Sequence, residues 1–225
     1  MNIKIKLLKF TNDPEKICAV ATKLCRSSEN IDEISGNFTK KKIKELIGRI
    51  ISSGHHSVLE HSSFTFGVEG VSRVLLAQLT RHRIASFSVQ SQRCVRFENG
   101  VEYVVPGTIK KNKTLLKKYD NFLKNTETLY KEFLDAGIPA EDARYILPNA
   151  SATKMVITMN ARELRHFFSL RCCNRSQWEI RDLACLMLNL VRKEAALLFS
   201  DAGPDCVRKG CNEVFPCDKP WKKCK

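Results

Sequence analysis

A chain of 225 residues in which 43% of the side chains are hydrophobic can bury one core, so we expect one domain. The formal net charge of +14 favours anionic partners, such as nucleotides, polyglutamylated folates or nucleic acid, without choosing among them. Apolar runs stay short of the roughly 18 residues that a membrane helix needs, and the N-terminus has no secretory pattern, so we expect a cytoplasmic protein without a membrane partner. Ten cysteines without a signal peptide are expected to be reduced thiols, metal ligands or core residues.

Strands and amphipathic helices alternate along the first half of the chain. Asp13 followed by Pro14 predicts the N-cap and the first residue of a helix, and Gly70 is expected to end a strand. The other boundaries follow from apolar residues repeated at spacings of two, or of three and four. The expected strands are 3–10 and 64–68, and the expected helices are 14–24, 41–52 and 71–80. The polar stretch 81–93 shows neither period, which predicts an ordered loop.

The second half of the chain is predicted to be mainly helical. Gly137 supplies a stop for a long amphipathic helix, and Ser176 with Glu179 has the spacing of a capping box at the start of the last helix. The expected helices are 114–136, 139–147, 161–170 and 176–198, and the expected strand is 152–159. Helices with intervening strands, and no internal repeat, predict an α/β or α+β domain.

The densest chemical signal is Arg81-His82-Arg83, followed after seven residues by Ser91 and then by Arg93. These side chains offer many hydrogen-bond donors and almost no carboxylate acceptors, and a guanidinium can bind phosphate oxygens bidentately. The pattern therefore predicts a phosphate or pyrophosphate site. A basic surface loop without a ligand is the alternative that composition leaves open.

A second cluster, residues 54–61, contains three histidines and one glutamate. The H-E-x-x-H order of a helical zinc site is missing, so we predict no metal ion there. Histidines that stack on a planar cofactor, or form hydrogen bonds with it, are the favoured interpretation. An ordinary structural role for at least one of the three histidines is the alternative that remains open.

A third cluster runs from Asn160 to Glu179. Arg162 and His166 are four residues apart on a predicted helix, so they share a face and could address one ligand. Arg171 lies near the C-terminal end of that helix, where the helix dipole favours a cation even without a ligand. Arg144 is a fourth basic candidate that is ambiguous by itself.

Taken together, these segments resemble the flavin-dependent thymidylate synthases, the ThyX family. Its signature, RHR followed by seven residues and a serine, is matched by Arg81-His82-Arg83 and Ser91. Segments 54–61, 143–148 and 160–179 agree with three further motifs, so the resemblance covers roughly residues 50–200. It implies a mixed, largely antiparallel central sheet flanked by long helices, in a catalytic domain of residues 1–205 that is followed by a Cys- and Lys-rich tail, 206–225.

The resemblance also implies roles for individual residues. Arg171 would face the uracil ring of dUMP, where its fixed charge favours an ionised ring nitrogen and polarises the pyrimidine, so it is the expected catalytic residue. The expected FAD-binding residues are His55, Ser57, Arg81, His82, Arg83, Asn160, Arg162 and His166. The expected dUMP-binding residues are Gln78, Arg81, Ser91, Gln92, Arg93, Arg144 and Arg171. Ser88 and Val89 depart from the asparagine and acidic residue that are usual in the family, so these two contacts are not carried over.

The reaction implied by the resemblance agrees with what the sequence lacks. Conventional thymidylate synthases attack uracil with a cysteine in a Pro-Cys-His context, whereas Pro216-Cys217 has no histidine after it. The implied reaction is therefore reductive methylation of dUMP to dTMP without a cysteine nucleophile. FAD carries the reducing equivalents of NADPH, and 5,10-methylenetetrahydrofolate donates the carbon. A homotetramer with the flavin between subunits is implied as well.

Two other functions would also account for part of the sequence. A nucleic-acid-binding protein would explain the charge, but no aromatic stacking platform or recognition motif is evident, so we expect no nucleic-acid partner. A flavin-binding member that has lost activity is the second alternative. The tail cysteines Cys206, Cys211, Cys217 and Cys224 lack paired C-x-x-C spacing, which favours a reduced, partly ordered tail over a zinc site.

Overall fold

The computed structural model describes residues 2–36, 38–98, 100–207, 210–211, 213–217 and 219. Contacts divide the chain into two compact units whose segments alternate along the sequence. Unit 1 consists of Met1–Lys4, Val68–Thr80 and Ser88–Val156, and unit 2 of Ile5–Gly67, Arg81–Phe87 and Ile157–Lys225. A single catalytic domain over 1–205, followed by a separate tail, stays a prediction.

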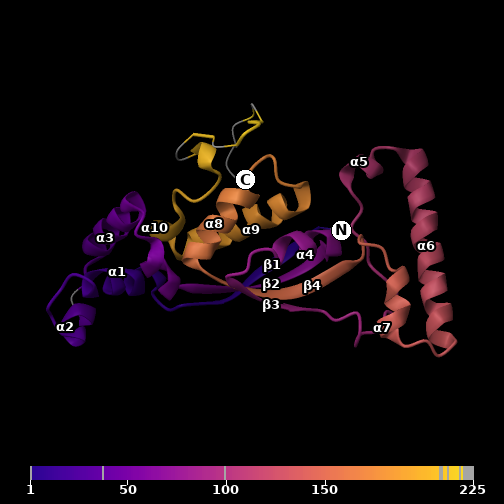
Figure 1. Ribbon diagram of the computed structural model, residues 1–225, viewed down its shortest axis with the longest axis horizontal. Helices are drawn as coiled ribbons and strands as arrows, with labels where there is room; N and C mark the ends of the chain where they lie inside the picture. The colour runs from indigo at the N-terminus through magenta and orange to yellow at the C-terminus, as the bar shows by residue number, and fades with distance from the viewer. Residues whose placement is uncertain are drawn as a thin grey trace. The chain divides into compact units, whose positions relative to one another are not determined.

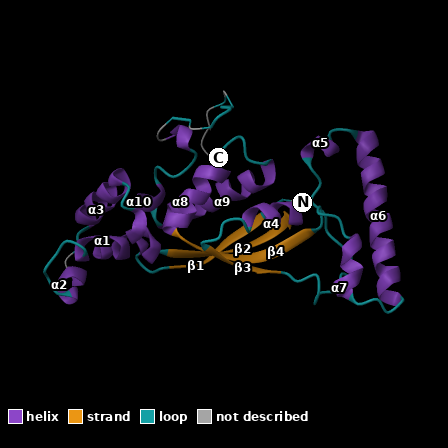
Figure 2. Cartoon of the chain, viewed as in Figure 1, coloured by secondary structure: helices purple, strands orange, loops and turns teal. Residues whose placement is uncertain are grey.

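Four antiparallel strands form the sheet, in the order β1-β2-β4-β3 (Figure 2). They are β1 (Lys4–Phe10), β2 (Ser63–Ser72), β3 (Ala85–Val89) and β4 (Ala152–Asn160). Buried and less buried side chains alternate along most of β2 and along β4, as expected for a sheet with one covered face. The predicted fold class, helices with a largely antiparallel sheet, is confirmed.

In unit 2, helices α8 and α9 lie over the strands (Figure 1). The helical elements of this unit are α1 (Pro14–Leu24), α2 (Ile31–Gly36), α3 (Lys40–Ser53), η1 (His56–His61), α8 (Ala161–Arg171), α9 (Trp178–Glu194), α10 (Ala196–Phe199) and η3 (Asp205–Val207). The ring of Phe199 lies edge-on to Phe64 of β2 at 5.4 Å and to Phe168 of α8 at 6.0 Å. Such aromatic pairs contribute about 0.5–1.5 kcal/mol each beyond their burial. These contacts fix α8, which carries much of the candidate site, on the sheet.

In unit 1, the long helix α6 lies beside α7 (Figure 1). The helical elements of this unit are α4 (Arg73–Leu79), α5 (Gly107–Lys110), α6 (Lys113–Asp135), α7 (Ala140–Ala143) and η2 (Arg144–Ile146). Asn112 caps α6, because its side chain accepts a hydrogen bond from the Leu115 amide, and Gly137 follows the helix with φ 82°. None of the described helices is long and apolar enough to cross a membrane.

Two strand predictions were wrong. The stretch 81–93 contains strand β3, and β2 continues past Gly70 to Ser72. Strand β3 lies at an edge of the sheet and alternates only between partly exposed and exposed side chains, so it carries no clear hydrophobic period. Pairing with a neighbouring strand, which local sequence does not reveal, decides both boundaries.

The predicted caps of two helices also differ from the structure. Asp13 precedes α1 in the left-handed region, with φ 46°, and its side chain forms no capping hydrogen bond. Helix α9 is capped by Gln177, which accepts from the amides of Glu179 and Ile180. The hydroxyl of Ser176 instead donates to the carbonyl of Leu170, 2.7 Å away. The last helix also ends earlier than predicted, at Glu194, with α10 separate from it.

Candidate active site

The predicted site residues separate between the two units according to their predicted ligand. Every residue predicted to bind FAD belongs to unit 2. Of the residues predicted to bind dUMP, Arg81 and Arg171 belong to unit 2 and the other five to unit 1. The chain thus provides a group of FAD candidates and a group of dUMP candidates, each with its own local scaffold.

The centre of the unit 2 group is the buried imidazole of His82, which is only 5% exposed. Its Nδ1 lies 3.0 Å from Oε1 of Glu163, and its Nε2 accepts a hydrogen bond from Nε of Arg171 at 3.1 Å. A guanidinium has no acceptor, so Nε2 must be the unprotonated nitrogen and Nδ1–H donates to the carboxylate. Both ring nitrogens of this predicted FAD ligand are therefore engaged by protein side chains.

Electrostatics in this cluster favour a neutral His82 beside two cations. Burial lowers the pKa of His82, although the hydrogen bond to Glu163 opposes this, and the charge of Arg171 lowers it further. Burial also lowers the pKa of Arg171, and the nearby charge of Arg81 adds to the effect. Arg81 and Arg171 thus repel each other, which is an arrangement that an anionic ligand would stabilise.

The other FAD candidates are distributed over η1 and the start of α8. Asn160 caps α8 by accepting from the Glu163 amide at 2.8 Å, so part of its polar capacity serves the helix. Arg162 and His166 are both exposed, as their spacing predicted for one face, and Arg162 forms an ion pair with Glu60. His55 and Ser57 line a cavity of about 500 Å³ formed by α1, α3 and η1.

The dUMP candidates of unit 1 gather around α7. Nε of Arg93 pairs with the carboxylate of Glu141 at 2.6 Å, and Nε of Arg144 donates to the carbonyl of the same residue at 2.9 Å. The hydroxyl of Ser91 accepts from the Arg93 amide at 3.1 Å, which fixes the turn after β3. Gln92 is buried, and Gln78 is a partly exposed residue of α4. Three of the five predicted residues are therefore brought together.

Sequence reasoning missed two residues that belong to these clusters. Glu163 is the carboxylate partner of His82. Arg73 begins α4, where burial lowers its pKa and the nearby charge of Arg144 lowers it further; its Nη1 is buried without a hydrogen-bond partner among the described residues. A charged residue between the apolar Val71 and Val74 was the available signal for Arg73.

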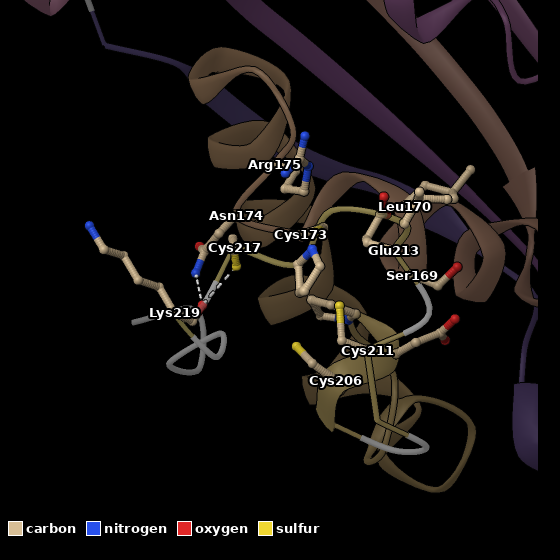
Figure 3. A pocket seen from close by; sticks show the side chains of 14 residues that line it. Ser169, Leu170, Cys173, Asn174, Arg175, Cys206, Cys211, Glu213, Cys217 and Lys219 are labelled. Carbon is tan, nitrogen blue, oxygen red and sulfur yellow. Dashed lines mark hydrogen bonds between the residues drawn. The ribbon is translucent and has the colours of Figure 1, made fainter.

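The described part of the tail forms a separate cavity of about 390 Å³ with α8 and the segment after it (Figure 3). Four free cysteines line it: Cys173, Cys206, Cys211 and Cys217. The carbonyl of Lys219 accepts from Nδ2 of Asn174 at 2.7 Å and from the Cys217 thiol at 3.2 Å. None of the predicted site residues is among the described residues that line this cavity.

The thiol states agree in large part with the expectation of reduced cysteines. Among the residues that the structure describes, eight cysteines are free thiols, whereas Cys185 is disulfide-bonded. Among the described residues, no group of three or more histidine, cysteine or acidic side chains is arranged to hold a metal ion. Cys224, one of the four tail cysteines considered for zinc, lies outside the described residues.

Comparison with known proteins identifies the family. The model of the family described as thymidylate synthase complementing protein matches residues 6–196. The flavin-dependent thymidylate synthase of Geobacter sulfurreducens is 49% identical over 212 residues, which is 94% of this chain and 91% of that protein. That of Clostridium tetani is 42% identical over 236 residues, which is 97% of this chain and 94% of that protein.

A solved structure has the same fold. The UMP/dUMP methylase PolB from Streptomyces cacaoi, crystallised with 5-Br dUMP, matches with a TM-score of 0.76 at 23% identity, over 88% of this chain and 94% of that one. This likeness concerns the fold, and the sequence relatives carry the assignment. The chain belongs to the family of flavin-dependent thymidylate synthases.

Proposed function

We propose that this chain is a flavin-dependent thymidylate synthase that converts dUMP to dTMP, with 5,10-methylenetetrahydrofolate as carbon donor and NADPH as reductant through FAD. The observation that carries the proposal is the cluster of Arg171, His82 and Arg81 in a member of this family. A neutral imidazole holds Arg171 next to a second cation, so that the guanidinium can stabilise negative charge that develops on a bound pyrimidine. Arg171 is the catalytic residue in this proposal.

The donor set of unit 2 fits FAD. Arg81, Arg83, Arg162 and His166 are exposed donors suited to the diphosphate, and His55 and Ser57 line a cavity for a planar group. Bound FAD supplies the hydride chemistry of the reaction. The protein's own residues bind and orient the reactants, which removes much of the entropic part of the barrier.

Two buried cysteines are unsuited to act as a protein nucleophile. Cys172, directly after Arg171, is buried, and burial raises its pKa to about 12. Burial also raises the pKa of Cys18 to about 11. A thiol must ionise to attack a pyrimidine, so these two cysteines would be unreactive at neutral pH.

In unit 1, the proposal assigns the dUMP phosphate to Ser91, Arg93 and Arg144, and it adds Arg73. The buried Nη1 of Arg73 and the repulsion between Arg73 and Arg144 support an anion there. Arg73→Met should raise KM for dUMP by about 10- to 100-fold, because a hydrogen bond to a charged group contributes about 1.5–3 kcal/mol. Lys154→Met removes the same charge from an exposed position of unit 1 and should leave KM within about twofold. Equal KM values for the two variants would remove Arg73 from the site.

The proposal includes a homotetramer with active sites between subunits, as in the family. It is carried over from the family to which the chain belongs. Light scattering of the purified protein should give about four times the chain mass of 25.6 kDa. A monomeric protein that still turns over would contradict the shared site.

Two measurements test the function itself. The purified protein should be yellow, with the bands of oxidised flavin, and should release tritium from ring-labelled dUMP when NADPH and methylenetetrahydrofolate are present. Flavin without tritium release would instead indicate an inactive family member. A colourless protein whose RNA or DNA binding weakens steeply with salt would replace the proposal with a nucleic-acid-binding function.

A further inference from the structure

Glu163 is a buried carboxylate, 6% exposed, to which neither the sequence motifs nor the family resemblance gave a role. We propose that Glu163 is a positioning residue that acts on Arg171 through His82: it fixes the orientation and tautomer of the imidazole, which in turn holds the guanidinium. The inference rests on the proposed function, because it requires Arg171 to act on the substrate. It adds to the proposed catalytic residue Arg171 the two residues that orient its guanidinium, Glu163 and His82.

The geometry of α8 explains why an intermediary is needed. Glu163 lies in the first turn of the helix and Arg171 in the last, so their backbones are about 12 Å apart along the axis. His82, from a segment 81 residues away from Glu163, spans this gap with one nitrogen on each side chain. Phe167 contacts the ring edge-on, with centroids 5.0 Å apart. Two hydrogen bonds and this contact leave the ring little freedom.

A purely local role for Glu163 does not explain where its carboxylate points. At the third position of a helix, glutamate commonly reaches back to the backbone amide of the N-cap residue. Here the carboxylate turns to His82, while the Glu163 amide is satisfied by the side chain of Asn160. The positive end of the helix dipole favours the negative charge in this turn. The carboxylate is therefore placed to accept from Nδ1–H, which leaves Nε2 as the acceptor that Arg171 requires.

As a result, the guanidinium of Arg171 is held at its Nε atom by the hydrogen bond to His82. An arginine fixed at this atom has lost much of the side-chain freedom that it would otherwise lose on binding substrate, and its terminal nitrogens have a defined direction. Pre-organised donors of this kind stabilise developing charge more than mobile donors do. Loss of Glu163 should thus lower turnover while FAD, which its side chain does not contact in this proposal, stays bound.

The first experiment determines the tautomer of His82 without any need for activity. Two-bond proton–nitrogen correlations of the protein with labelled histidine, at mildly alkaline pH, should show His82 protonated at Nδ1, and the His82→Gln variant assigns its signals among the five histidines. A wild-type His82 protonated at Nε2 overturns the proposal. Because this readout is independent of turnover, it separates failure of this inference from failure of the proposed function.

The second experiment compares Glu163→Leu, which removes the acceptor, with Glu163→Gln, which keeps an acceptor oxygen. In Glu163→Leu, kcat/KM for dUMP should fall by on the order of 10- to 100-fold, as expected for a misplaced catalytic group, at unchanged FAD content per chain. Glu163→Gln should retain a larger share of the activity. Wild-type kcat/KM in Glu163→Leu, or its loss together with FAD, overturns the proposal.

A matched control separates positioning from general stability. Arg165 is a buried residue of α8, the helix that also carries Glu163, and its Nη1 lies 2.7 Å from Oδ1 of Asp201. The substitution Asp201→Asn weakens this ion pair. It should lower the melting temperature without changing the His82 tautomer or kcat/KM. If Asp201→Asn reduces kcat/KM as much as Glu163→Leu does, the effect of Glu163 is one of stability and the proposal fails.

The pH profile gives a further readout that a structural role would not move. The ionisable groups that influence His82 are Glu163, Arg171 and His166, all on α8. The hydrogen bond to Glu163 raises the pKa of His82 against the effect of burial, so its removal should lower this pKa. The acid limb of the pH profile of kcat/KM should accordingly move to lower pH in Glu163→Leu. An acid limb at the wild-type pH would contradict the proposed action of Glu163 through His82.

Discussion

At the scale of single residues, the candidate site is defined by cations that lie near other cations. Arg81 lowers the pKa of Arg171 in unit 2, and Arg144 lowers that of Arg73 in unit 1, in each case after the effect of burial. A protein without an anionic ligand gains nothing from such pairs, because like charges repel and burial adds a desolvation penalty. Substitutions at these positions should therefore change ligand-dependent properties more than the stability of the free protein.

Arg171→Ala should abolish turnover while largely sparing flavin binding, because the guanidinium acts on the pyrimidine in the proposed mechanism. The measurements are tritium release from labelled dUMP and the flavin spectrum of the same sample. Arg175→Ala is the control: Arg175 is exposed and donates to the carbonyl of Phe215, so turnover should persist. Loss of flavin and turnover together in Arg171→Ala would show that the residue is misplaced.

The His82 imidazole predicts how stability depends on pH. Its folded-state pKa lies below the ordinary value of about 6.5, so between these two pKa values the unfolded chain binds more protons than the folded one. The free energy of unfolding should therefore decrease as pH falls below about 6.5, and the contribution from His82 should be complete above it. Urea unfolding across this range, compared with His82→Gln, tests the sign; a wild-type and a variant with the same pH dependence would contradict it.

At the scale of elements, the site depends on how α8 and α9 begin. Asn160 and Gln177 satisfy amides in the first turns of these helices, and residues 172–177, which join the helices, follow Arg171 directly. An uncapped first turn of α9 would loosen this connection, because helix ends without partners tend to fray. The position of the Arg171 side chain therefore depends on the caps of α8 and α9 as well as on its own hydrogen bond to His82.

Gln177→Ala should reduce the free energy of unfolding by about 1 kcal/mol, because it removes the acceptor for two amides at the start of α9. Gln177→Ser should recover most of this loss, since serine is a favourable N-cap residue. The midpoints of urea unfolding provide the measurement. If both variants were as stable as the wild type, the Gln177 cap would have no energetic role.

For the protein as a single charged body, the net charge of +14 influences encounter with substrate more than the chemical step. The proposed substrates dUMP, NADPH and folate are all anions, and salt screens charges over about 10 Å at 0.1 M. We expect kcat/KM for dUMP to fall several-fold between low and high salt while kcat at saturating dUMP changes little. Steady-state kinetics over a series of KCl concentrations test this, and a parallel decline of kcat would point to salt-sensitive assembly or chemistry instead.

Those elements and motifs whose cause is local could be predicted from the residues alone. Period-two alternation in β1 and β4, and apolar spacing in α3, α6 and α8, reflect one face of each element turned to the core, and Gly137 ends α6 because glycine adopts positive φ without strain. The RHR motif with Ser91 identified the family that the comparisons show. Each of these signals lies within a single stretch of chain.

Features that require a partner far away in the sequence could be recognised only in the folded chain. Strand β3 exists because it pairs with β4, and His82 became the intermediary between Glu163 and Arg171 because folding brings segments 81 and 89 residues apart into hydrogen-bond distance. Arg73 can be recognised as a candidate site residue only once the fold shows the charge of Arg144 next to it. Hydrogen bonds, burial and charge interactions depend on the distance between groups in space. The spacing of residues in the sequence predicts that distance only within a few turns of helix or a few residues of strand.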